Sequence, residues 1–177
     1  PGSATLCATD AALLLFAELG GTPDAGGTWS GPSAVIGGLY DPATMPPGVY
    51  TYTITVPPPC VNASSTVTIT EVAPPNAGND GAITLCISSP ATSLFAALGG
   101  APQAGGSWSG PSTVTAGQFD PATMDAGVYT YTVNGTAPCP PASATVTVNV
   151  VANPDAGSPG AITLCTTDGV ADLFAQL

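Results

Sequence analysis

The side chains that could do chemistry in this chain are of two kinds, thiols and carboxylates. The 177 residues include five cysteines and eleven Asp or Glu, and they include no Lys, Arg or His. Catalysis at neutral pH relies mostly on His, Lys or a carboxylate positioned by Arg, and nucleic-acid binding relies on Lys and Arg. A formal charge of −11 also repels nucleic acid and anionic lipid. We therefore predict no enzyme activity, no cofactor and no nucleic-acid partner.

The cysteines recur at a fixed interval. Cys7, Cys86 and Cys165 are spaced by 79 residues, and the same interval separates Cys60 from Cys139. Metal ligation is disfavoured because the chain has no His and no C-x-x-C spacing, so these thiols favour disulfides. Disulfides persist in oxidising compartments. The cysteines therefore predict an extracellular or cell-surface protein.

The 79-residue offset also relates the rest of the chain, and no gap is needed. The related positions include the pairs Phe16 and Phe95, Trp29 and Trp108, and Tyr50 and Tyr129. Such a repeat indicates an array of similar units. We predict two domains, over residues 1–77 and 78–156, and the start of a third copy over residues 157–177. The partner of Cys165 would then lie outside this chain.

Two disulfide pairings agree with the repeat. Pairs Cys7–Cys60 and Cys86–Cys139 would join the first strand of each unit to its last hairpin, which stabilises a small domain by ~4 kcal/mol. The alternative pairs, Cys60–Cys86 and Cys139–Cys165, would bond each unit to the next. We favour the pairing within a unit, because each unit must be able to close on its own.

Alternating side chains predict strands. Residues 48–56 place Tyr, Ile and Val on one face and mostly Thr on the other, and residues 65–70 repeat this pattern to complete a hairpin. Residues 4–7 and 28–30 are predicted as shorter strands. Residues 11–19, which precede two glycines, are predicted as a short helical turn in preference to a buried strand. Short strands at this density indicate an all-β Greek-key sandwich.

One segment resembles the D-x-G-x-Y-x-C signature of immunoglobulin-like domains. Residues 125–131 read DAGVYTY, so a Tyr stands where the signature has its Cys. The resemblance implies tandem immunoglobulin-like β-sandwich repeats without the usual disulfide between the sheets. It also implies corner tyrosines at Tyr50 and Tyr129, whose hydroxyls bond the backbone upstream, and core tryptophans at Trp29 and Trp108. An aromatic ligand cage is the alternative for the tryptophans.

The carboxylates are predicted to be structural. Asp41 and Asp120 recur in a D-P-A-T sequence that is typical of a turn closed by the Asp side chain. We predict no metal site. The alternative is calcium at the joints between repeats, where the oxygen-bearing side chains are Asn76, Asn79, Asp80, Asn153 and Asp155. Calcium takes six to eight oxygen ligands, more than these side chains supply.

Over its whole length the chain resembles the tandem immunoglobulin-like or PKD-like repeats of large cell-surface proteins of Bacteroidota. The motifs that carry the resemblance are LFAALGG (94–100), GGSWSGPS (105–112), FDPATM (119–124) and AGVYTYTV (126–133), followed by Ala137-Pro138-Cys139. The resemblance implies a gliding or attachment adhesin that is exported by type IX secretion.

Two functions are considered, of which we predict the first and keep the second as the alternative. The first is a structural stalk or filament, whose partners are neighbouring repeats, with end-to-end or lateral self-association. The second is a carbohydrate-binding module, for which Trp29, Trp108 and Tyr40 would have to lie exposed in a row. The surface or glycan ligand stays open. No membrane insertion is predicted, because the longest apolar run, residues 11–17, is too short to cross a bilayer.

Overall fold

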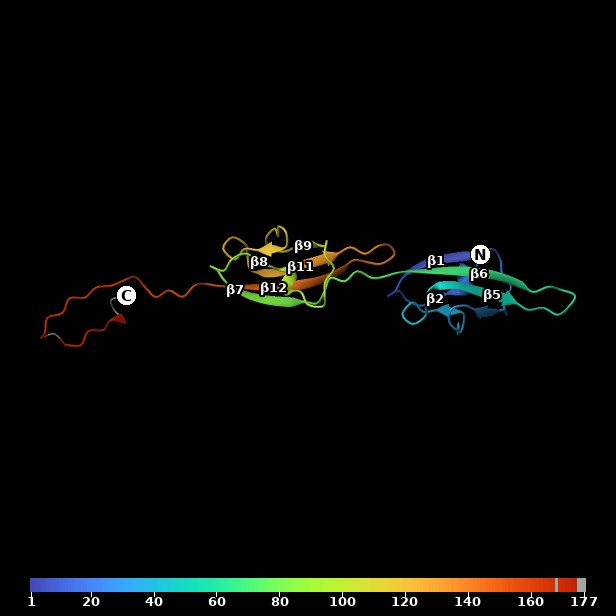
Figure 1. The fold of residues 1–177 in the computed structure, drawn as a ribbon, viewed down its shortest axis with the longest axis horizontal. Coiled ribbons are helices and arrows are strands. Elements are labelled where there is room, and N and C mark those ends of the chain that lie inside the picture. The colour runs from blue at the N-terminus through green and yellow to red at the C-terminus, as the bar shows by residue number, and fades with distance from the viewer. Residues whose placement is uncertain (168, 175–177) are drawn as a thin grey trace.

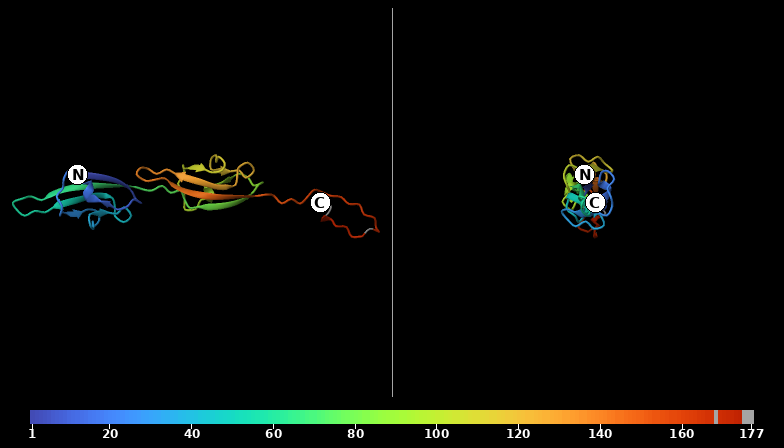
Figure 2. Two further views of the ribbon diagram at one scale, coloured as in Figure 1. Left: turned by 180° about the vertical axis from the view of Figure 1, so that it is seen from behind. Right: turned by 90° about the vertical axis from the view of Figure 1, so that its right-hand side faces the viewer.

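The computed structural model describes residues 1–167 and 169–174. Two β-sandwich units follow one another along a common long axis, and an extended segment continues from the second unit (Figure 1). The end-on view shows both units within one narrow outline, so the molecule is a rod (Figure 2). Residues 152–167 form no strand and are exposed to solvent, so a third copy over residues 157–177 stays a prediction.

Both units are built from the same elements in the same order. The first contains β1 (Gly2–Cys7), β2 (Leu13–Leu14), the 3-10 helix η1 (Leu15–Glu18), β3 (Thr28–Ser30), β4 (Leu39–Tyr40), β5 (Gly48–Ile54) and β6 (Ala63–Val72). The second contains β7 (Gly81–Cys86), β8 (Thr92–Ser93), η2 (Phe95–Ala97), β9 (Ser107–Ser109), β10 (Gln118–Phe119), β11 (Gly127–Val133) and β12 (Ala142–Val151).

Each unit packs a four-stranded sheet against a two-stranded sheet. The larger sheet of the first unit has the order β1-β6-β5-β3, in which β1 runs parallel to β6 and the other pairs are antiparallel. The smaller sheet pairs β2 with β4. The second unit repeats both sheets with β7 to β12. This arrangement confirms the predicted all-β fold of immunoglobulin-like sandwiches.

The predicted strands are present with small shifts in their bounds. The two strands of the predicted hairpin are β5 and β6, and the shorter predicted strands are β1 and β3. The ambiguous segment over residues 11–19 divides into β2 and η1, so the short helical turn is confirmed for part of it. Leu15 is fully buried, and it anchors this turn to the core.

The corner tyrosines sit at the centre of each unit. Tyr50 and Tyr129 have no exposed surface, and their hydroxyls donate to carbonyl oxygens four residues upstream, at 2.7 Å to Pro46 and 2.6 Å to Asp125. Gly31 passes so close to the Tyr50 ring that an added Cβ would lie 2.4 Å from it. Only glycine fits at that position, because no side chain tolerates such a contact.

A second tyrosine replaces the missing disulfide between the sheets. Tyr52 is 4% exposed, and its hydroxyl accepts the Gly27 N–H at 2.7 Å and donates to the Asp24 carbonyl at 3.0 Å. Tyr131 makes the same two bonds in the second unit, at 2.8 Å each. The buried ring fills the core, and its hydroxyl fixes the loop that leads into β3 or β9.

The tryptophans lie nearer the surface than the tyrosines. Trp29 and Trp108 are half-buried and pack against the edge of the core, whereas the tyrosines occupy its centre. The ring of Trp29 lies 5.1 Å from that of Tyr52. Because β3 and β9 are the edge strands of the larger sheets, one side of each indole faces solvent. Each tryptophan therefore packs against its core, as predicted, but at the periphery and not in the fully buried centre.

The two cores differ at one pair of facing residues. In the first unit, the buried Tyr40 hydroxyl contacts both the Glu71 carboxylate and the Met45 carbonyl. The second unit has Phe119 and Val150 at the equivalent positions, and both pack into its core. Burial, reinforced by the hydrogen bond to Glu71, raises the pKa of Tyr40 well above its usual value.

We expect alkaline pH to destabilise the first unit through Tyr40. The pKa of Tyr40 is raised on folding. The stability that neutral Tyr40 gives the folded unit is therefore fully present below the unfolded pKa of about 10. Above that pH the free energy of unfolding falls, by up to about 1.4 kcal/mol per pH unit. The double substitution Tyr40→Phe with Glu71→Val copies the second unit and should remove this dependence. Urea unfolding of both proteins from pH 8 to 11 tests it, and a stability difference independent of pH would contradict it.

Candidate functional site: the junction between the units

The recurrent carboxylates close turns. The Asp41 carboxylate accepts the Ala43 N–H at 3.0 Å and the Thr44 hydroxyl at 2.9 Å. Asp120 accepts the equivalent Ala122 N–H at 3.0 Å. Both carboxylates therefore have the local structural role that the D-P-A-T sequence predicts.

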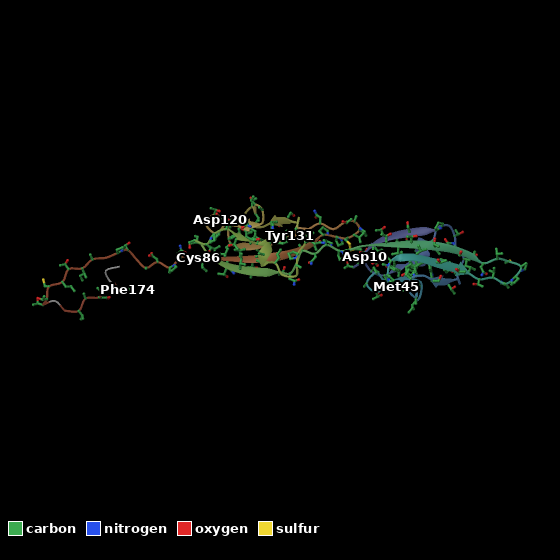
Figure 3. All side chains as sticks on the ribbon, viewed as in Figure 1. Asp10, Met45, Cys86, Asp120, Tyr131 and Phe174 are labelled. Atoms are coloured by element: carbon green, nitrogen blue, oxygen red, sulfur yellow. A yellow bond between two sulfur atoms is a disulfide. The ribbon has the colours of Figure 1, made fainter. Side chains whose placement is uncertain are left out.

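The thiol chemistry is concentrated where the two units meet. Cys7, the last residue of β1, forms a disulfide with Cys139, which lies between β11 and β12. The Cα atoms are 4.9 Å apart, although the residues are separated by 132 positions in the sequence. Figure 3 shows sulfur atoms beside Asp10, at the end of the first unit that faces the second. The bond therefore connects two domains.

This connection differs from both predicted pairings. β1 runs parallel to β6 with Cys7 opposite Val72, the last residue of β6, whereas Cys60 precedes the first residue of β6. The length of β6 places these cysteines about 30 Å apart, far beyond the reach of a disulfide. Pairing within the first unit is therefore excluded by strand direction.

The same geometry excludes the second predicted pairing. Cys86 stands at the end of β7, opposite Val151, and therefore at the pole of the second unit that faces away from the first. Cys60 stands at the pole of the first unit that faces away from the second. The whole rod therefore separates Cys60 from Cys86. Residue spacing allowed these pairings, because it contains no information about which pole each cysteine occupies.

A projecting hairpin brings Cys139 to the first unit. The connection between β11 and β12 extends along the linker toward β1 (Figure 1). Its tip is a turn in which the Cys139 N–H donates to the Thr136 carbonyl at 2.9 Å. A Cβ on Gly135 would lie 2.4 Å from the Cys139 carbonyl oxygen, so glycine allows the tip to fold this tightly. Cys139 is only 5% exposed, and its Sγ lies 3.3 Å from the Val72 carbonyl oxygen.

The linker forms the second connection, and Asn76 fixes it to the second unit. The Asn76 side-chain amide donates to the carbonyls of Gly100 and Ala101 at 3.0 and 3.2 Å. Its Oδ1 accepts the Gly78 N–H at 2.9 Å. Its backbone exchanges two hydrogen bonds with Gln103, at 2.9 Å to the side chain and 2.8 Å from the main chain.

Contacts of the second unit begin before its first strand. Ala77 is 3% exposed and belongs to the core of that unit. Asn79 exchanges two backbone hydrogen bonds with Gly99, at 2.8 and 3.2 Å. Residues 76–79 are thus already packed on the second unit, and residues 73–75 connect them to Val72. A crevice of about 430 Å³ lies between this linker and the hairpin of the second unit.

Four of the five side chains proposed for calcium, those of Asn76, Asp80, Asn153 and Asp155, accept hydrogen bonds from the protein. In addition to the bonds of Asn76, Asp80 accepts the Thr145 N–H at 2.7 Å, and Asp155 accepts the Gly157 N–H at 2.9 Å. Asn153 accepts the Ser88 hydroxyl at 2.8 Å. Within residues 1–167 and 169–174, no three His, Cys, Asp or Glu residues gather as a possible metal site. The calcium alternative therefore gains no support.

The row of exposed aromatics that the carbohydrate-binding alternative requires is not formed. Tyr40 is fully buried, and Trp29 and Trp108 are half-buried on separate units. The second unit does have a shallow groove of about 500 Å³, which is lined by Phe95 of η2, Trp108 of β9, Tyr131 of β11 and loop residues. In the described part of the chain, no helix is long and apolar enough to cross a membrane.

Several known structures are similar to this chain at low sequence identity. The insect immune protein hemolin is 16% identical over 85% of this chain and 45% of its own, with a TM-score of 0.44. The titin I-band fragment I67–I69 is 15% identical over 85% and 63%, with a TM-score of 0.43. Extracellular domains 3–5 of Drosophila OTK are 14% identical over 93% and 67%, with a TM-score of 0.33.

The chain thus spans less than two thirds of the hemolin and titin chains. No protein-family model matches the sequence, and the search of curated proteins found no match.

The role of Asn76 had no signal in the sequence beyond its position in a joint, and it can be tested separately from the disulfide. Asn76→Ala removes two donors to the second unit, so we expect local opening of the docked linker to become easier by about 1 kcal/mol. The amides of Asn79 and Gly99 should then exchange about fivefold faster. Asp155→Ala is the matched control, because the one hydrogen bond of its carboxylate within the described residues comes from the corresponding turn N–H. Unchanged exchange in Asn76→Ala would contradict the role of this side chain.

Proposed function

We propose that this chain is a segment of an extended extracellular stalk, in which immunoglobulin-like repeats are locked to one another covalently. The observation that supports this most directly is the Cys7–Cys139 disulfide between two successive units. A bond between domains adds little to the core of either domain, but it removes bending and separation at the junction. A stalk needs this property, because it must hold its tip at a distance.

The junction has two connections, and this makes it stiff. The linker and the β11–β12 hairpin run side by side across it (Figure 2). The hairpin is held by the disulfide, and the linker is held by Asn76. Two fixed connections resist both bending and rotation, whereas a single flexible linker between domains resists neither.

The finer assignment follows from the family resemblance. We propose that the stalk belongs to a bacterial cell-surface adhesin of the type found in Bacteroidota, exported by type IX secretion, and that it presents an adhesive tip. Disulfides require an oxidising setting, which supports an extracytoplasmic location. The lack of Lys and Arg removes every trypsin cleavage site, which suits a protein exposed to secreted proteases. Neighbouring repeats are its proposed partners.

Carbohydrate binding is a weaker candidate. The groove beside Trp108 is its only support among the described residues. The ring centroids of Trp108 and Tyr131 lie 5.0 Å apart, so one face of the Trp108 indole is packed against the core. The stalk is favoured, because it accounts for the repeat, the rod shape and the bond between domains together.

The stalk proposal predicts how the chain responds to force. When the ends are pulled, the disulfide shields every residue between Cys7 and Cys139 from tension. Reduction exposes this span, a sequence separation of 132 residues, to force, which adds ~450 Å of contour length at full extension. Cys7→Ser should behave like the reduced protein, and Cys60→Ser, whose thiol is exposed, should behave like the oxidised wild type. Single-molecule pulling with and without a reductant measures this. Equal contour lengths would contradict a covalently locked junction.

A further inference from the structure

Cysteines equivalent to the bonded pair stand at the two outer poles of the rod. Cys60 corresponds to Cys139, and Cys86 corresponds to Cys7. The bonded cysteines are 0% and 5% exposed, whereas Cys60 is exposed and Cys86 is half-exposed. Because the surrounding folds are the same, the difference in burial comes from the presence or absence of a neighbouring unit. Each outer cysteine is therefore placed where a neighbour would cover it.

Cys86 has the same strand position and backbone hydrogen bonding as Cys7. The strands that end in these residues read GAITLC and GSATLC. Cys86 pairs with Val151 in the register in which Cys7 pairs with Val72. In each unit, the N–H of the residue after the cysteine donates to the carbonyl of this paired valine. The distance is 2.9 Å from Ile87 and 3.0 Å from Ala8. Cys86 thus occupies the position that a hairpin from the next unit would reach.

Cys60 lies in the same kind of hairpin turn as Cys139. It lies in the connection between β5 and β6, and its N–H donates to the Pro57 carbonyl at 3.2 Å, as Cys139 does to the Thr136 carbonyl. The hairpin of the first unit points away from the second unit, toward the end where the chain begins (Figure 1). It projects from the first unit in the way that the β11–β12 hairpin projects from the second.

We propose that the Cys7–Cys139 bond is one rung of a continuous disulfide ladder. In this ladder, Cys86 bonds the cysteine of a following unit that corresponds to Cys139, and Cys60 bonds the cysteine of a preceding unit that corresponds to Cys7. Each unit is then bonded at both poles and has no disulfide of its own. The ladder rests on the proposed stalk. The stalk, in contrast, does not require that every junction is bonded.

The surroundings of Cys86 suit its oxidation. The Ser88 hydroxyl lies 3.5 Å from the Cys86 sulfur, and hydrogen bonding by Ser88 lowers the pKa of the thiol. A lower pKa raises the fraction of thiolate, which is the attacking species in disulfide exchange. The thiol is 2.6 Å from Asn153 Oδ1, so this contact must open when a neighbour binds.

The chemical step is thiol–disulfide exchange with a disulfide oxidant. The Cys86 thiolate attacks the oxidant and displaces one of its sulfurs as a thiolate. The neighbour's thiolate then attacks the mixed disulfide at the Cys86 sulfur and displaces the second. The two protein thiols thus lose two protons and two electrons, and the oxidant disulfide becomes two thiols.

The test inserts one repeat into the full chain. A second copy of residues 73–151 is placed after Val151, which preserves the 79-residue period and reproduces the first junction at the second. Cys60→Ser and Cys165→Ser are included throughout. Ala91 and Ser143, which are exposed, are changed to Val and Ala in the inserted copy, so that its Cys86-bearing and Cys139-bearing peptides can both be recognised by mass. The unreduced protein is digested with chymotrypsin after its thiols have been alkylated.

The ladder predicts that Cys86 of the first copy is linked to Cys139 of the inserted copy, beside the native Cys7–Cys139 bond. One cysteine, the inserted Cys86, should be alkylated. Cys139→Ser in the inserted copy is the control, and it should leave both copies of Cys86 alkylated. Three alkylated cysteines, or a link within one copy, would overturn the ladder.

X-ray scattering distinguishes this failure from failure of the stalk. A rod that is longer by one unit but lacks the second bond would overturn the ladder alone. A compact particle would overturn the stalk as well.

Discussion

The direction of the first strand in each unit determines how this chain is held together. β1 lies parallel to β6, so Cys7 and the start of the linker share one pole of the sandwich. The β5–β6 hairpin, with Cys60, must then be at the opposite pole. A sandwich with cysteines at opposite poles cannot bond them to each other, but it can bond each of them to a neighbour. The connection between Cys7 and Cys139 is the direct result.

The absence of cations makes the rest of the design depend on burial and neutral hydrogen bonds. No ion pair between side chains is possible in a chain with no Lys, Arg or His. Each core is instead organised by two tyrosines whose rings are buried and whose hydroxyls bond the backbone. Buried hydroxyls with full hydrogen bonding stabilise a unique packing. Neither unit therefore requires an internal disulfide, which leaves the cysteines available for the junctions.

The sequence predicted the architecture of a unit because local patterns determine it. Alternation gave the β5–β6 hairpin, and the DAGVYTY segment gave the corner tyrosine. The prediction placed the tryptophans too deep, because the pattern does not reveal that β3 and β9 are edge strands. The tyrosine at the usual cysteine position indicates that a disulfide is missing, but no sequence pattern indicates the two hydrogen bonds of its hydroxyl.

The junction could not be predicted in the same way, because it depends on contacts between residues more than one repeat apart. All five cysteines follow one fixed period, so the period agrees equally well with several pairings. The direction of the strands must be known before one of these pairings can be chosen. The docking of Asn76 likewise depends on two carbonyls whose orientation only the folded loop defines.

One measurement tests the central claim most directly: mass spectrometry of the wild-type chain after chymotryptic digestion without reduction. The account predicts a linked pair of peptides, one containing Cys7 and the other containing Cys139. A link between Cys7 and Cys60 would contradict it, because that bond requires the first strand to run in the opposite direction.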